Sequence, residues 1–204
     1  MRFSPRHPST PIHCHAFLFL CLTLLCLLSQ AGCDSQSANP GNLASEAFDP
    51  NRWITVEEPT LGFRSKFPGK WKHRTQFMQM PQGSATVHIF EYWHIAFQYG
   101  ITVTRLPPGV SDLRNPNRVL DYAVQSIIDE HGGTLTFQEN RNVGGFSARR
   151  ARITLSESYL KSAQLNTLIV LRDNLVYRIS TAGVGNHEHI EFFLNSFETI
   201  PIQW

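Results

Sequence analysis

Apolar and polar residues alternate along several short stretches of the chain, a pattern typical of β-strands with one buried face. The clearest stretch runs from Phe97 to Val103, where every second residue is aromatic or aliphatic and the others are glutamine, glycine and threonine. Pro107, Pro108 and Gly109 follow it, and these residues favour turns. We expect further strands at residues 53–56, 62–67, 71–80, 84–94, 134–141, 150–155, 165–171 and 175–181, and the tail 199–204 is a candidate for a closing strand.

The alternation also predicts which side chains face the core. In the stretch 150–155 we expect Ala151, Ile153 and Leu155 to point inward and Arg150 and Arg152 to face water, because successive side chains lie on opposite faces of a strand.

Two other stretches support the same pattern of strands and turns. Leu135 and Phe137 alternate with polar neighbours in the stretch 134–141. The segments 165–171 and 175–181 predict a hairpin across Asp173 and its neighbours, since Asp and Asn tolerate the positive φ of a tight turn.

Two stretches have the spacing of amphipathic helices instead. Asn115 is a suitable N-cap, Pro116 suits the first helical position, and Gly132 and Gly133 mark the end of the first helix. Asn186 is expected to cap a shorter second helix. The apolar stripes of the two helices consist of Leu120, Ala123, Val124, Ile127 and Ile128, and of Ile190, Phe193, Leu194 and Phe197.

These elements predict an α+β fold with about eight or nine strands and two helices. Short turns join neighbouring strands, so the sheet is expected to be mostly antiparallel. Each helix must bury its apolar stripe on a face of that sheet. We therefore expect an α/β/α sandwich, with helices that flank a curved sheet.

The N-terminal part of the chain has a different pattern. Arg2 and Arg6 precede an apolar run from Ala16 to Leu28, which has the length of the hydrophobic region of a signal peptide. As a helix it would span only about 20 Å, so a permanent transmembrane helix is the weaker interpretation. Residues 1–33 are predicted to be the signal peptide, 34–51 a flexible tether, and 52–204 the folded domain.

The residues after the apolar run predict how the protein is held. Ala31-Gly32-Cys33 resembles the bacterial lipobox, in which the cysteine receives lipid on its sulfur and becomes the new N-terminus. Gln30 lies where that pattern usually has leucine, valine or isoleucine. Ordinary cleavage near Ala31, which would release a soluble protein, is the alternative. No cysteine follows Cys33, so the folded domain contains neither disulfides nor cysteine-bound zinc.

Composition narrows the class of partner. The chain has 18 basic and 16 acidic residues. Without Arg2 and Arg6 the two charges balance, which argues against nucleic acid as a partner. A membrane, an envelope protein or a small ligand is the expected partner.

Several segments resemble PsbP-like and DcrB-like domains. The segment from Gly62 to Gly69 is similar to the GFxxxFPG opening of those domains, and Gly132-Gly133, Asn174–Tyr177 and Phe193–Phe197 follow in the same order. The resemblance implies an antiparallel sheet flanked by helices, in an accessory protein of a cell envelope or thylakoid lumen that has no enzymatic activity. It assigns no metal or partner residues in this chain.

The densest group of candidate metal ligands is His187-Glu188-His189-Ile190-Glu191. In a helix, His187 and Glu191 share a face, but a zinc site would need a third ligand from elsewhere, and the HExxH spacing is absent. The alternative is the polar first turn of an amphipathic helix. His88 and His94 would lie about 20 Å apart on one strand and cannot bind one ion together.

Two more groups have open interpretations. The aromatic residues around 90–99 predict core packing or, alternatively, an apolar ligand cleft. A basic run is expected to be solvated, or to rest on anionic lipid headgroups. The two groups are Phe90, Tyr92, Trp93, Phe97 and Tyr99, and Lys66, Lys70, Lys72 and Arg74.

The resulting hypothesis is a lipid-anchored, exported protein of the bacterial cell envelope, with its domain facing the periplasm, that binds or supports a partner without catalysis. No cofactor is expected. The alternative is an exported hydrolase or metal-dependent enzyme, with a site assembled from His88, His94, His187 and Glu191. A third possibility is a structural component of a larger assembly.

Overall fold

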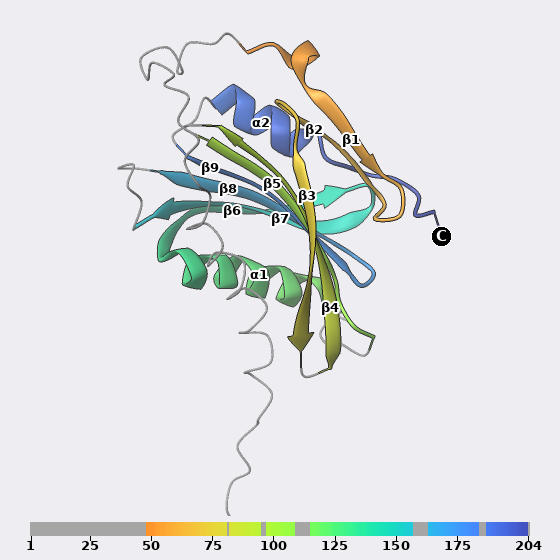
Figure 1. The fold of residues 1–204 in the computed structure, drawn as a ribbon. Coiled ribbons are helices and arrows are strands. Elements are labelled where there is room, and N and C mark those ends of the chain that lie inside the picture. Colours follow the sequence, from red (N-terminus) through yellow and green to blue (C-terminus); the bar gives the residue numbers. More distant parts are fainter. Residues whose placement is uncertain are drawn as a thin grey trace, which may run out of the picture.

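The computed structural model describes residues 48–80, 82–94, 97–108, 115–156, 163–183 and 187–203 (Figure 1). In chain order, the elements are η3 (Pro50–Arg52), β1 (Ile54–Glu58), β2 (Phe63–Phe67), β3 (Lys72–Met80), β4 (Gly83–His94), β5 (Phe97–Arg105), α1 (Pro116–His131), β6 (Gly133–Val143), β7 (Phe146–Leu155), β8 (Gln164–Arg172), β9 (Leu175–Gly183), α2 (His187–Asn195) and β10 (Glu198–Thr199).

Within the described residues the strands form two antiparallel sheets. The larger sheet has seven strands in the order β3-β4-β5-β9-β8-β7-β6, and the smaller has three in the order β1-β2-β10. The expectation of a mostly antiparallel sheet with two helices is therefore confirmed.

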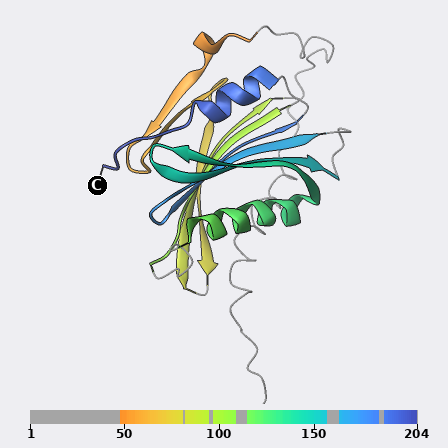
Figure 2. The same ribbon diagram turned by 180° about the vertical axis from the view of Figure 1, so that it is seen from behind.

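The two helices lie on opposite faces of the large sheet (Figures 1 and 2). Helix α1 packs against β6, β7 and β8, whereas α2 packs against β8, β9 and the small sheet's β2. One face is thus covered by a single helix and the other by a helix together with the small sheet, which the sequence did not indicate as a separate layer.

Local sequence signals explain where α1 begins and ends. The side chain of Asn115 accepts a hydrogen bond from the backbone N–H of Arg118, which satisfies one of the free donors of the first turn. Gly132 has φ 60° and donates its N–H to Ile128. A glycine accepts this left-handed conformation without steric cost, so the helix ends there as predicted.

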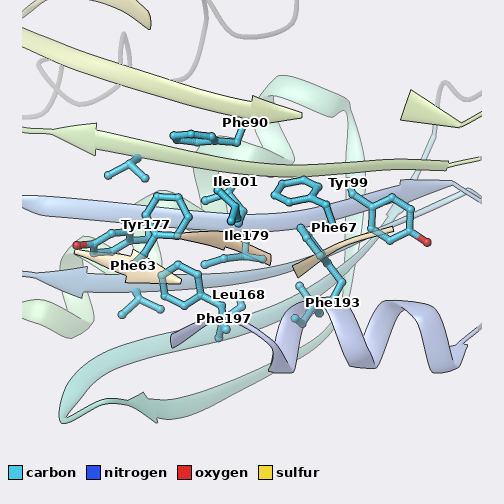
Figure 3. Close-up of a cluster of buried hydrophobic side chains, with 14 of the residues drawn as sticks. Phe63, Phe67, Phe90, Tyr99, Ile101, Leu168, Tyr177, Ile179, Phe193 and Phe197 are labelled. Carbon is cyan, nitrogen blue, oxygen red and sulfur yellow. The ribbon is translucent and has the colours of Figure 1, made fainter. Parts of the chain in front are cut away.

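The main core lies between the large sheet, the small sheet and α2 (Figure 3). Phe63 and Phe67 of β2 are fully buried against Phe90 and Tyr177 of the large sheet and against Phe193 of α2. Burial of such rings stabilises the fold by about 2 kcal/mol for each side chain. A second core lies under α1, where Leu120, Val124 and Ile127 meet Ile153 and other residues of β7 and β8.

The expected orientation of Arg150 and Arg152 is wrong. Arg150 and Arg152 do not face water, because that face of β7 is covered, and Arg150 forms an ion pair with Glu191 of α2. Leu135 and Phe137 are 37% and 41% exposed, since β6 is the edge strand of the large sheet. The inward positions are correct for Ala151 and Ile153, which are buried.

The expected last strand is also shorter than predicted. Of the described residues at this end of the chain, Glu198 and Thr199 alone pair with β2. Pro201 has no backbone N–H for a ladder, and the chain continues as an extended segment in which Ile200 and Gln203 donate to Gly62 and Pro59.

Candidate functional site

A solvent-open groove of about 300 Å³ lies between β2 and the C-terminal half of α2. It is lined by Thr55, Arg64, Ser65, Lys66, Phe192, Asn195, Ser196 and Glu198.

Strand alternation places the polar side of the groove. Phe63, Ser65 and Phe67 are buried, so Arg64 and Lys66 project from the opposite face of β2.

One serine joins the two walls of the groove. Ser196 Oγ lies 3.0 Å from Ser65 Oγ and accepts a 3.1 Å hydrogen bond from the backbone N–H of Lys66. It also donates to the carbonyl of Phe193. These bonds hold the end of α2 against β2, so the shape of the groove depends on the Ser196 side chain.

The two basic side chains of the groove differ in their ion pairs. Arg64 binds Glu57 at 2.8 Å and lies 3.9 Å from Glu198. Lys66 forms no ion pair within the described residues, and its Nζ lies 5.5 Å from the centre of the Phe192 ring. An ammonium group beside an aromatic wall fits a small group that combines a carboxylate or phosphate with an apolar part.

Phe192 also connects the groove to the first described residues. Its ring lies 5.2 Å from that of Phe48 and 5.0 Å from that of Trp53. The N-terminal end of the described fold is therefore fixed next to the groove.

The structure places His187 and Glu191 on one helix face, as expected. His187 Nδ1 lies 3.7 Å from Glu191 Oε1, and the same oxygen accepts a hydrogen bond from Arg150 Nη2. Burial alone would raise the pKa of Glu191, but the hydrogen bond and charge of Arg150 outweigh it and hold that pKa below its ordinary value. The carboxylate therefore joins α2 to β7.

No group of three or more His, Cys, Asp or Glu side chains is placed to hold a metal ion within the described part of the chain. His88 lies 3.3 Å from Thr75 Oγ1 and stacks on His73, whereas His94 packs beside Phe97. The pairing of His73 with His88 was not expected, because it depends on the register of β3 and β4, in which Thr75 is opposite His88.

The residues of the aromatic group differ in burial, and those of the basic run lie on different sheets. Phe90 and Tyr99 are core residues, whereas Trp93 is 49% exposed. Lys66 belongs to the small sheet, whereas Arg74 belongs to the large sheet and pairs with Glu91 at 3.4 Å.

A buried polar cluster at the end of α1 had no signal in the sequence. The Glu130 side chain is 4% exposed, its oxygens have no hydrogen-bond partner, and Arg178 Nη1 lies 3.5 Å away. Burial raises the pKa of Glu130 and, together with the charge of Arg178, lowers the pKa of His131 to about 4. The cluster could be predicted only from the strand order that brings Arg178 of β9 close to the end of α1.

Cys33, the predicted lipidation site, lies outside the described residues, as do the predicted signal peptide, Asn186 and most of the tether. None of the helices in the described segments is long and apolar enough to cross a membrane.

Comparison with known proteins shows a likeness of fold. No family model matches the chain, and no curated protein matches it by sequence. The solution structure of cyanobacterial PsbP (CyanoP) from Synechocystis matches with a TM-score of 0.52 and 10% sequence identity, over 80% of this chain and 97% of that one. A Pseudomonas aeruginosa protein of unknown function, described as a putative regulator, gives a TM-score of 0.35 and 12% identity, over 65% and 83% of the two chains. The chain thus has a PsbP-like fold.

Proposed function

We propose that this protein is an exported, lipid-anchored component of a bacterial cell envelope, and that its PsbP-like domain binds a partner or ligand without catalysis. The observation that carries the proposal is the order of Arg2 and Arg6, the apolar run Ala16–Leu28 and then Ala31-Gly32-Cys33.

The chemistry of Cys33 supports an anchor. A thiol is the side chain that forms a thioether with lipid, and the small residues Ala31 and Gly32 would admit a peptidase. A diacylated cysteine gives stable attachment, whereas a single acyl chain gives only marginal binding.

The position of Phe48 supports a binding surface near the membrane. Fourteen residues, 34–47, separate Cys33 from Phe48. A flexible segment of that length has a root-mean-square span of about 20 Å. Because Phe48 packs on Phe192, the groove beside β2 lies at the end of the domain that the anchor would hold near the headgroups. Its ammonium and aromatic walls suit an acidic, partly apolar ligand.

The test of the anchor is lipid labelling with membrane fractionation of the Cys33→Ser variant. Labelling and membrane retention should both be lost, because serine offers no thiol. The Cys26→Ser variant is the matched control and should keep both. Equal labelling of the Cys33→Ser variant would overturn the anchor.

The binding role has a separate test. A photo-cross-linking residue at Asn195, in the groove, should capture a partner or ligand in the native envelope. The same residue at Asn117, exposed on α1, is the control and should capture none. Identical adducts at both positions would contradict the groove as the binding surface.

A further inference from the structure

Strand β6 is a long edge of the large sheet. It has 11 residues, pairs with β7 on one side only among the described strands, and is exposed over most of its length. Figure 2 shows it at the front of the sheet. Leu135 and Phe137 add exposed apolar surface to it. Such an edge offers a row of unpaired backbone groups for another strand.

The turn that follows β6 determines which backbone groups are free. Gly144 and Gly145 have φ of 60° and 91°, as in a type I′ turn, and they join Val143 directly to Phe146. Residues that flank such a turn form a hydrogen-bonded pair, and the pattern alternates along the ladder. The backbone groups of Gln138, Asn140 and Asn142 therefore point away from β7.

The side chains of β6 are complementary to themselves. Glu139 and Arg141 lie on one face, two residues apart, and form an ion pair with each other at 2.6 Å. If a second β6 runs antiparallel with Asn140 opposite Asn140, each Glu139 lies opposite Arg141 of the second copy. In that register, Phe137 lies opposite Val143 of the second copy, and the free backbone groups also meet.

We propose that β6 pairs with β6 of a second copy of this chain about a two-fold axis at Asn140. Neighbouring registers are disfavoured, because an axis at Glu139 or at Arg141 sets two like charges against each other. The opposite edge is different. Strand β3 carries Lys72, His73 and Arg74 and no acidic residue, and a basic edge repels its own copy.

The pairing also orients the two copies. An antiparallel ladder about such an axis keeps corresponding faces on the same side of the joined sheet. Both copies would therefore present α2 and Phe48 on one side. Self-pairing does not depend on lipid attachment, but it is compatible with two copies in one bilayer.

The first test measures self-association of the full chain in detergent by sedimentation velocity over a range of concentrations. Glu139→Arg and Arg141→Glu should each weaken dimerisation about tenfold, because two attractive cross-strand pairs become repulsive. The double variant, which exchanges the two charges, should restore it. Glu57→Arg, at an exposed pair on the small sheet, should have no effect. A monomeric parent chain, or a double variant no stronger than the single ones, would overturn the proposal.

A second test measures which residues of the two β6 strands lie opposite each other. In the proposed ladder the two Asn140 Cα atoms lie about 5.5 Å apart, within the range of a disulfide. The Asn142 Cα atoms lie about 14 Å apart, which is beyond it, because four residues along the strand and the gap between the strands separate them. Asn140→Cys should therefore give a cross-linked dimer on mild oxidation, and Asn142→Cys should give only the background of the parent chain. Equal cross-linking of both would contradict the axis at Asn140.

Discussion

The hydroxyl of Tyr177 donates a 2.7 Å hydrogen bond to the carbonyl of Leu61, 116 positions earlier in the chain. The bond is buried and joins β9 of the large sheet to the turn between β1 and β2. It therefore holds the two layers of the main core in one arrangement.

Removal of this hydroxyl should weaken the contact between the sheets. We expect Tyr177→Phe to lower the free energy of unfolding by about 1 to 2 kcal/mol, because the Leu61 carbonyl loses a buried partner. Urea denaturation measures the change. The control is Tyr92→Phe, since Tyr92 forms no hydrogen bond through its hydroxyl within the described residues, and it should change stability by less than about 0.5 kcal/mol. Equal effects of the two variants would contradict a specific role for the Tyr177 bond.

Gly144 and Gly132 both have φ of 60° but different surroundings. A Cβ at Gly144 would overlap Thr199 Oγ1, whereas a Cβ at Gly132 meets no atom within 4 Å. We expect Gly132→Ala to cost about 1 kcal/mol, from backbone strain alone, and Gly144→Ala to cost more than about 2 kcal/mol. Thermal unfolding measures both changes. Addition of Thr199→Ala should recover part of the loss at Gly144, and failure to do so would show that the overlap is not the cause.

The ion pair between Arg150 and Glu191 joins β7 to α2. A double-mutant cycle with Arg150→Ala and Glu191→Ala should give a coupling free energy of about 1 to 2 kcal/mol, because both side chains are largely shielded from water. The exposed pair of Glu57 and Arg64 should give about 0.5 kcal/mol or less.

The strength of the ion pair between Arg150 and Glu191 should depend on pH. Because the pKa of Glu191 is held below its ordinary value in the folded state, its stabilising effect is present above pH 4.5 and is lost as the pH falls through the lowered value. A coupling that stays constant into that acidic range would contradict this assignment.

The buried His131 predicts a loss of stability in mild acid. Its pKa falls to about 4 in the folded state, mainly because of burial, so the unfolded chain binds more protons between about pH 6.5 and 4. The free energy of unfolding should therefore decrease as the pH falls through that range. Glu130 acts in the opposite direction, since burial raises its pKa and its protonation favours the folded state.

The His131→Gln variant separates the two effects. Between pH 6.5 and 4, the free energy of unfolding of this variant should decrease by about 1 to 2 kcal/mol less than that of the parent chain, because the imidazole is absent. This difference is smaller than the full pKa shift implies, since solvent screens part of the effect. Urea denaturation at several pH values measures it. If the free energy of unfolding depended on pH in the same way in the variant and the parent chain, groups other than His131 would cause the loss of stability in acid.

The sequence predicted the elements better than their surroundings. Alternation, the cap at Asn115 and the glycine at 132 are local signals, and the structure has a strand or helix at each expected stretch that it describes. Local signals do not tell which strand is at an edge. Phe137 is half exposed and Arg150 is shielded because of strand order, which the pattern of each strand does not contain.

In the candidate site, too, local sequence signals predicted single elements but not the contacts between them. The helix face shared by His187 and Glu191 follows from their spacing, but the bond to Arg150 depends on where α2 lies. The groove could not be predicted, because its walls come from β2 and α2, about 130 residues apart, and meet through Ser65 and Ser196.

Arg172 connects the beginning of the fold to its end. Its Nη1 donates to the carbonyls of Gly62 and Ile200, while β2 lies between β1 and β10. The first hairpin of the domain is thus completed by Glu198 and Thr199, which lie far from it in the sequence. Until these residues are in place, the β1–β2 hairpin lacks one of its two neighbours, so its backbone amides should be among the last in the main core to gain protection from hydrogen exchange during refolding.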